Sequence, residues 1–434
     1  MFARSGLALA AAALIMGAAS AAEAPPAPNP AWTNKACTYG NFLADTWRPT
    51  PAFAGQTQAP TIRSATPFKV EAFAEGLSHP WSLAFLPDGR MLVTERPGRM
   101  RIVGKDGVLG DPITGLPPMT TAAGEGLHDV ILDPNFQHNR LIYFTYFAPP
   151  AGEPARTATQ KEWAAWLALG AADRESHKIG IERISRARLS DDGRSLEQVT
   201  KLLDGGNRRI VAARDGKTLY VTAATTSGNG LTAIDGPQYL SNDYGKVLRI
   251  RTDGSTPSDN PFVGKPGARA EIFALGFRDP EGATLNPATG ELWTVEHGPR
   301  GGDELNIIRK GHNYGYPAIS YGREYSQELI NGGLTAKPGM DQPVYYWVPS
   351  IAPSGLLFYT GKLFPEWKGS LFLGSQAGRH LIRLTLKGGR VTGEERLLGD
   401  RCKRIRDVRQ GPDGALYLLT DEDAGQVLRL TPKS

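Results

Sequence analysis

The stretch ATLNPATGELWTVEHG, residues 283–298, carries the pattern that decides the fold of this 434-residue chain. Two apolar runs flank an Asn-Pro-Ala-Thr-Gly turn, which is typical of a β-hairpin. Related hairpins recur along the chain from residue 68 to residue 432. At about 60 residues for each four-stranded repeat, they predict an all-β fold, a six-bladed β-propeller. The other instances are residues 83–103, 130–147, 210–223 and 411–432, together with 371–386, where the turn is missing.

The beginning of the chain predicts export. Arg4 precedes a short apolar run from Leu7 to Met16, and small residues follow at 19–21, as in a secretory signal peptide. That run is too short to cross a bilayer, which needs roughly 20 residues. We therefore expect a signal peptide over residues 1–21 and a mature chain that is secreted or periplasmic, without a membrane span. Residues 22–67 are rich in Pro and Ala and predict an N-terminal extension, so the propeller occupies residues 68–432.

Charge and cysteine content limit the partners. The net charge is +5, from 49 basic and 44 acidic side chains, which gives little support for nucleic-acid binding. The two cysteines, Cys37 and Cys402, are available for a disulfide in an oxidising compartment. A bridge and two separate thiols both remain open, because the sequence does not give the distance between them.

One segment departs from the strand pattern. TATQKEWAAWLALGAAD, residues 157–173, places aromatic and leucine side chains at helical spacing and predicts a short helical insertion. It either packs against the rim of the propeller or forms an aromatic lid over the central opening.

Three charged loops are candidate ligand sites. Arg278 begins an Arg-Asp-Pro-Glu-Gly run, and Arg404 and Arg406 alternate, so a strand would turn both guanidiniums the same way. Two such guanidiniums suit a polycarboxylate, although a salt-bridged or solvated edge explains them too. The glycine-rich segment at 298–304 provides carbonyl and carboxylate oxygens of the kind that Ca²⁺ prefers.

These clusters resemble the soluble sugar dehydrogenases that use pyrroloquinoline quinone (PQQ), the glucose/sorbosone dehydrogenase family. The likeness rests on HPWSLAFLPDGRMLVTER (79–96), YGKVLRIRTDGSTPSDNPF (244–262), GPRGGDELN (298–306), YYWVPSIAPSGLLFY (345–359) and RIRDVRQGPDGALYLLTDE (404–422). The resemblance implies a six-bladed propeller that binds PQQ and calcium at its mouth. It also implies oxidation of an aldose to a lactone, with an external electron acceptor.

Residue by residue, the resemblance implies that Arg278, Arg404 and Arg406 hold the cofactor. It implies that the carbonyls of Gly298 and Pro299 bind the calcium of the quinone. Glu304 and the Tyr314 carbonyl match a second, structural calcium site.

Other parts of the family's site are replaced. The family's catalytic histidine lies in an Asp-His-x-x-Gly-Arg-Leu-Val run, and this chain has DGGNRRIV at 204–211, with Gly205 at the histidine. Thr225 replaces its supporting aspartate, and Ala377 replaces a quinone-binding lysine. The Asn and Gln of the arginine motif are Asp279 and Glu281, and a further glutamine becomes Glu125 or Gly124. Glu125 and His128 are candidate substitute bases, since removal of a hydroxyl proton needs one.

Two classes of function follow. The first is an exported quinoprotein-type oxidoreductase acting on an aldose, or on a related alcohol or aldehyde, with PQQ and Ca²⁺. The second is a propeller without catalysis that binds sugars or proteins. A metal-assisted hydrolase or lactonase using Asp279 and Glu281 is a third, minor hypothesis.

Overall fold

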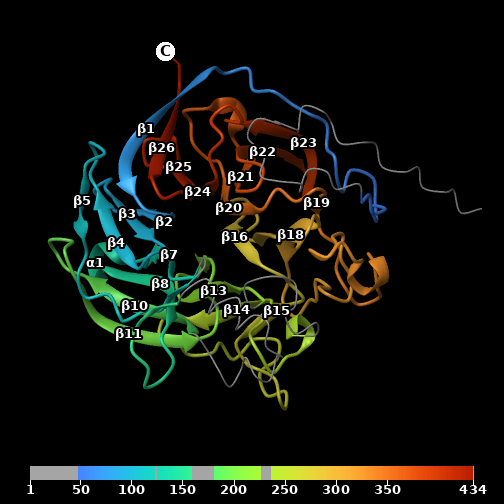
Figure 1. Cartoon of the computed structure of the whole chain (residues 1–434), viewed down its shortest axis with the longest axis horizontal. Helices are drawn as coiled ribbons and strands as arrows, with labels where there is room; N and C mark the ends of the chain where they lie inside the picture. Colours follow the sequence, from blue (N-terminus) through green and yellow to red (C-terminus); the bar gives the residue numbers. More distant parts are fainter. Residues whose placement is uncertain (1–46, 123–124, 159–179, 226–235, 434) are drawn as a thin grey trace, which may run out of the picture.

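The computed structural model describes residues 47–122, 125–158, 180–225 and 236–433. In this part of the chain, six four-stranded antiparallel sheets stand around a common axis, which confirms the six-bladed β-propeller (Figure 1). In chain order, blades 1 to 6 are formed by β2-β3-β4-β5, β7-β8-β10-β11, β12-β13-β14-β15, β16-β17-β18-β19, β20-β21-β22-β23 and β24-β25-β26-β1, each written from its first strand outward.

The strands are short, as the hairpin pattern predicts. In blades 1 to 3 they are β2 (Pro80–Phe85), β3 (Met91–Glu95), β4 (Arg99–Val103), β5 (Leu109–Pro112), β7 (Leu127–Leu132), β8 (Leu141–Ala148), β10 (Ile181–Leu189), β11 (Leu196–Asp204), β12 (Ile210–Ala212), β13 (Thr218–Ala223), β14 (Lys246–Arg251) and β15 (Ile272–Leu275). In blades 4 to 6 they are β16 (Pro280–Leu285), β17 (Leu292–Glu296), β18 (Asp303–Ile308), β19 (Tyr345–Trp347), β20 (Pro353–Phe358), β21 (Leu371–Ser375), β22 (His380–Lys387), β23 (Arg390–Leu397), β24 (Ile405–Gln410), β25 (Leu416–Thr420), β26 (Gly425–Pro432) and β1 (Phe68–Leu77).

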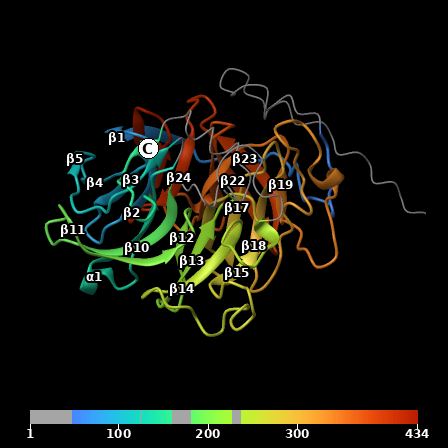
Figure 2. The same ribbon diagram turned by 60° about the horizontal axis from the view of Figure 1, so that its bottom comes forward.

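The core lies between the blades rather than at the axis. Both faces of the middle strands are covered, so β21 and β25 are buried along their whole length. A separate hydrophobic cluster fills each interface. The cluster of blades 6 and 1, for example, packs Leu419 and Val427 against Leu83 and Val93. The tilted view of Figure 2 shows the twisted blades side by side.

The ring is closed by the start of the domain. Strand β1 is the outermost strand of blade 6, where it pairs with β26 from Phe68↔Pro432 to Leu77↔Gly425. The chain then crosses to β2 and begins blade 1. Main-chain hydrogen bonds therefore join the two ends of the domain and leave no blade unpaired.

All six innermost strands begin at the same end of the axis, which we call the mouth. A β-bulge interrupts the ladder near the mouth end of β2, β16 and β24, and the bulged residues are Trp81, Glu281 and Arg406. The ladder of β7 is also irregular, between Leu127 and Val130. Bulges redirect side chains, which explains how charged and aromatic groups reach the axis from strands that are otherwise apolar.

Polar contacts tie neighbouring blades together below the mouth. Hydroxyl groups of one blade donate to main-chain carbonyls at the start of the next: Thr94 to His128 (2.5 Å), Thr145 to Arg208 (3.0 Å) and Thr222 to Pro280 (2.8 Å). This repeated bond fixes the spacing of the innermost strands.

Arg209 is the central member of this polar layer. Its guanidinium donates to the carbonyls of Glu281 (2.9 Å) and Arg406 (3.0 Å) and lies 4.0 Å from the ring centroid of Trp81. Nη1 also lies 3.4 Å from Asp129 and 3.2 Å from Asp407. One buried cation thus contacts blades 1, 2, 4 and 6 at once.

The described part of the N-terminal extension, from residue 47, follows the outside of blades 4 and 5 (Figure 1, blue trace). Gln56 donates to the Pro343 carbonyl, and the Ile62 amide donates to Glu394. The predicted signal peptide lies outside the described residues. Cys402 is disulfide-bonded, whereas Cys37 lies outside the described residues.

The predicted helical insertion is described only at its first two residues. These form β9 (Thr157–Ala158), which pairs in parallel with β6 (Thr121–Ala122), so they are extended rather than helical. The remainder, 159–173, lies outside the described residues. The α-helix that the structure does describe is the short α1 (Phe136–Asn139). No helix in the described ranges has the length and apolar character needed to cross a membrane.

We expect Arg209→Ala to destabilise the propeller by about 3–5 kcal/mol, because it leaves the carboxylates of Asp129 and Asp407 buried without their cation. Urea unfolding followed by fluorescence measures the change. Arg188→Ala, which removes a partly exposed arginine paired with Glu197, is the control and should change little. Equal midpoints for the two variants would contradict this role of Arg209.

Candidate functional site at the propeller mouth

A surplus of guanidinium groups surrounds Asp421, at the end of β25. Arg406 pairs with it through both Nε (3.2 Å) and Nη2, Arg96 lies 3.4 Å away, and Arg404 lies 3.9 Å away. His79 contacts the same carboxylate at 2.8 Å. Burial lowers the pKa of Arg96 and Arg404, and repulsion from Arg406 acts in the same direction. This group, the Asp421 cluster, therefore holds more positive charge than it neutralises.

Two of the three predicted cofactor arginines meet in this cluster. Arg404 is one-third exposed and donates to the side chain of Gln376 (2.8 Å), whereas Arg406 is buried. Arg278 lies apart from them, at the start of β16. There it donates to the His297 carbonyl (3.1 Å), and its guanidinium lies 5.9 Å from the ring centroid of Tyr325.

A second buried ionic group, the Arg208 cluster, lies across the mouth. Arg208 donates to both oxygens of Glu125 (3.1 and 3.3 Å) and to Asp279 (3.0 Å), and it lies 3.4 Å from Glu281. Burial opposes its charge, but the three carboxylates raise the pKa of Arg208 well above its ordinary value. Glu281 also pairs with Arg406 at 3.0 Å, so the two clusters form one network.

The two candidate substitute bases are both engaged. Glu125 is held by the bidentate pair with Arg208 described above. His128 is completely buried, stacks on Trp81 with centroids 5.1 Å apart, and directs Nδ1 to the Asn207 carbonyl at 2.7 Å. Burial lowers the pKa of His128, which keeps its ring neutral. As bases they remain predictions, and each would have to give up a buried contact to act.

The positions where the family's groups are replaced lie around the same mouth. Gly205 adopts φ +120°, and a Cβ there would come within 2.5 Å of Asp243 Oδ2, so this backbone does not accept a histidine side chain. Thr225 donates its amide to the Arg278 carbonyl at 2.6 Å. Ala377 follows Gln376, whose side chain accepts from Arg404.

The predicted calcium residues occupy two adjoining places. The Gly298 amide donates to Asp303 Oδ1 (2.8 Å), and Asp303 also accepts from Ser350, Ile351 and Ala352. Asp303 therefore organises the loop that holds Gly298 and Pro299. Tyr314 is buried and donates its hydroxyl to the Ile307 carbonyl at 2.6 Å.

Glu304 faces a second acid. It pairs in register with Glu296 across β17 and β18, and Asn306 donates to both carboxyls at 3.1 and 3.2 Å. Burial raises the pKa of Glu304 to about 8, and burial with repulsion from Glu304 raises that of Glu296 well above its ordinary value. Two carboxyls that resist ionisation together are suited to sharing a cation.

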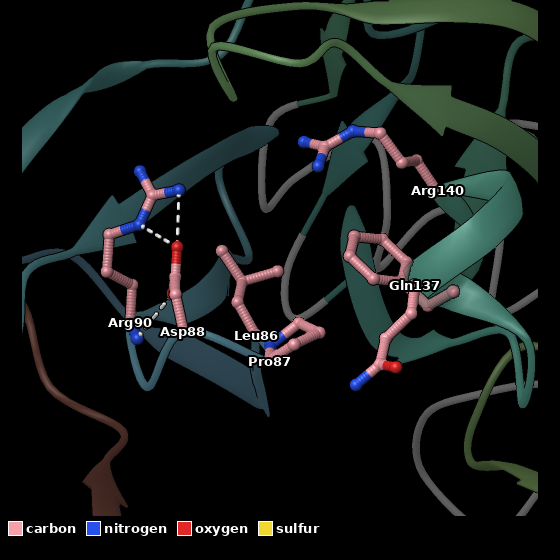
Figure 3. A pocket seen from close by; sticks show the side chains of 7 residues that line it. Leu86, Pro87, Asp88, Arg90, Gln137 and Arg140 are labelled. Atoms are coloured by element: carbon pink, nitrogen blue, oxygen red, sulfur yellow. Dashed lines mark hydrogen bonds and ion pairs between the residues drawn. The ribbon is translucent and has the colours of Figure 1, made fainter.

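A surface pocket of about 220 Å³ lies at the opposite end of β2 and β7 from the mouth (Figure 3). Asp88 and Arg90 pair with each other at 2.8 Å, and Arg140 donates to the Leu189 carbonyl at 2.8 Å. The charged side chains that line this pocket are thus already paired with neighbouring groups of the protein. It is lined by Leu86, Pro87, Asp88, Arg90, Phe136, Gln137 and Arg140.

Fold and mouth together define a six-bladed propeller whose charged groups converge from sequence-distant blades on one end of the axis. Comparison with known proteins gives the family: the chain belongs to the glucose/sorbosone dehydrogenase family, whose model matches residues 77–429. It is 38% identical to aldose sugar dehydrogenase YliI of Escherichia coli over 371 residues, which cover 84% of this chain and 93% of that protein.

A solved structure and a further sequence relative are also similar to this chain. The crystal structure of the soluble aldose sugar dehydrogenase of Escherichia coli in its apo-form superposes with a TM-score of 0.73 at 35% identity, covering 84% of this chain and all of that one. Quinoprotein glucose dehydrogenase B of Acinetobacter calcoaceticus is 26% identical over 439 residues, covering 83% of this chain and 86% of that protein.

Sequence reasoning did not single out Arg96, Arg208, Arg209 or Asp421. For Arg208 a signal was present: it stands at the glycine of the Asp-His-x-x-Gly-Arg-Leu-Val run, beside a second arginine. Its partners are the residues that replace the family's amides, Glu125, Asp279 and Glu281. The arginine that replaces the family's glycine therefore pairs with the acids that replace the family's amides, and only the tertiary structure shows these contacts.

The Arg208 cluster predicts an acid-sensitive step in stability. Burial alone would raise the pKa of Glu281, but Arg406 and Arg208 lower it from 4.5 to about 2. Because the pKa of Glu281 is lower in the folded protein than in the unfolded chain, its ionised form stabilises the fold at pH values above the unfolded pKa. This stabilisation, about 3 kcal/mol, is lost as the pH falls from 4.5 to 2.

We expect Glu281→Gln to weaken the fold at pH 7 and to flatten this acid dependence. Denaturant unfolding between pH 2 and 7 measures it, with Glu197→Gln as an exposed control. If the stability of Glu281→Gln depended on pH in the same way as that of the wild type, Glu281 would not be the source of the acid sensitivity.

Proposed function

We propose that this protein is an exported quinoprotein-type oxidoreductase that oxidises an aldose sugar, or a related alcohol or aldehyde, with PQQ and calcium. The observation that carries the proposal is the surplus of guanidinium groups in the Asp421 cluster. Electrons would pass to an external acceptor. Family membership and the relative described as a quinoprotein support the same reading.

The donor set fits PQQ, a tricarboxylate quinone. Arg404 and Arg96 are partly exposed and share one carboxylate with Arg406, so they have charge to offer an anionic ligand. Arg278 would contribute from the other side of the mouth. When bound, PQQ supplies the two-electron acceptor for substrate oxidation.

The oxygen donors fit calcium in a more limited way. Within the described ranges, no three acidic, histidine or cysteine side chains are grouped to hold a metal ion. Calcium would therefore depend on the carbonyls of Gly298 and Pro299 near the quinone. At the second, structural site, calcium would depend on Glu304 with the Tyr314 carbonyl. The opposed Glu296 favours a cation there.

A second function, ligand binding without catalysis, is favoured by one observation. The backbone at Gly205 disfavours the family's histidine, and Arg208 with its carboxylates fills part of the mouth. Sugar or protein binding by PQQ-free protein, unaffected by Arg404→Ala, would support this alternative.

We expect purified, calcium-loaded protein to bind PQQ, and Arg404→Ala to weaken binding by about 10- to 100-fold, because a charge-assisted contact is lost. Absorbance titration and calorimetry measure it. Arg401→Ala, on an exposed neighbour that donates to Val70, is the matched control. Absence of PQQ binding by the wild type would exclude the quinoprotein function.

Calcium should raise the thermal midpoint of PQQ-free protein, because a bound cation offsets the repulsion between Glu296 and Glu304. Glu304→Gln should remove most of that increase, whereas Glu324→Gln should preserve it. Differential scanning calorimetry with calcium and with chelator measures it. A calcium response that survives in Glu304→Gln would place the ion elsewhere.

A further inference from the structure

The place of a side chain at residue 205 is taken by an acid from a neighbouring segment. Asp243 Oδ2 lies 2.5 Å from where a Cβ on Gly205 would stand, and the Gly205 amide donates to the Glu182 carbonyl at 2.8 Å. Glu182 is near the mouth end of β10, on the same strand face as Ile184, which packs between blades 2 and 3. The Asp243 carboxyl and the Glu182 main chain therefore adjoin residue 205, and Asp243 is also the charge that acts most strongly on the Glu182 carboxyl.

The Glu182 carboxyl is not satisfied. Its Oε2 is buried and has no hydrogen-bond partner among the described residues. Buried carboxylate oxygens are nearly always paired, so an unpaired one at a functional mouth requires an explanation. The charges that act most strongly on it are those of Asp243, then Arg208, Glu125 and Asp279, which couples it electrostatically to the Arg208 cluster.

The other titratable groups in this neighbourhood are paired. Asp243 lies 3.1 Å from Arg269, and Asp279 lies 3.0 Å from Arg208. Glu125 and His128 are held as described above. Among these groups, Glu182 is the one that presents an unpaired oxygen.

We propose that Glu182 is the general base of this enzyme and takes the place of the missing histidine; this inference rests on the proposed function. The Glu182 carboxylate accepts the proton of the substrate C1 hydroxyl as the carbon–oxygen double bond forms. PQQ, when bound, would supply the acceptor for the C1 hydrogen and its electron pair, so that an aldose loses two hydrogens with two electrons and becomes a lactone. Asp243, fixed by Arg269, is a positioning residue that keeps negative charge beside Glu182.

The charges around Glu182 suit this task. Burial and then Asp243 raise the pKa of Glu182 well above its ordinary value, while Arg208 opposes the shift and Glu125 and Asp279 reinforce it. A base must be ionised to act, so turnover should rise with pH through this raised pKa and then level off. A base whose pKa lies near the working pH is the most effective.

The first test uses the PQQ-loaded, calcium-loaded enzyme. Glu182→Gln should lower kcat by about 10²- to 10⁴-fold, with PQQ affinity retained and the pH dependence lost. Glu182→Asp should recover part of the rate. Glu197→Gln, on β11 of the same blade, is the control and should match the wild type. A Glu182→Gln enzyme with wild-type kcat and pH profile would overturn the inference.

The second test needs no cofactor. Infrared titration of PQQ-free protein should show a carboxyl group that ionises well above the ordinary range and is absent from Glu182→Gln. If the two spectra titrate alike, the inference is wrong even if the enzyme is active. A wild type that neither binds PQQ nor oxidises any sugar, alcohol or aldehyde would overturn the proposed function and this inference together.

Discussion

Closure of the ring at its axis is the constraint on which the rest of this structure depends. Six innermost strands must approach one another closely, and β2, β16 and β24 add bulged side chains to the main-chain groups that meet there. Arg209 meets that demand by donating to carbonyls of two blades, contacting the carboxylates of Asp129 and Asp407 and covering Trp81. Because this polar layer fixes the strand ends, it also fixes the loops immediately above it.

The charges of the mouth are divided between two connected clusters. Around Asp421 the guanidiniums exceed the acids, which suits a polycarboxylate ligand. Around Arg208 the acids exceed the guanidinium, and Arg406 joins the two sides through Glu281. A ligand bound at the first cluster would therefore alter the electrostatics of the second. Under the proposed function, the first cluster would hold the anionic quinone, and the acids of the second would face the substrate.

The replaced residues are best understood as a set. Gly205 lacks a side chain, its φ of +120° strains any L residue, and the Asp243 side chain would have to move to admit one. Arg208 then occupies the mouth from a position where the family has glycine, and it draws together Glu125, Asp279 and Glu281. A single reversion such as Gly205→His would meet Asp243 and leave Arg208 in place. The chemistry of this site therefore depends on its own groups, not on partial restoration of the family pattern.

The sequence alone determined the architecture, because hairpin turns and apolar alternation are local signals repeated in every blade. It also indicated the arginines at 404 and 406 and the acids at 279 and 281, since these stand beside recognisable strands and motifs. The network that connects them was not accessible in this way. Arg208 and Glu125 are 83 positions apart, and Arg406 and Glu281 are 125 apart, so nothing local relates them. Only the tertiary structure decided that Arg208 contacts three acids, that Asp421 gathers three arginines, and that the Glu182 oxygen lacks a partner among the described residues, because contacts at a propeller mouth are made between blades.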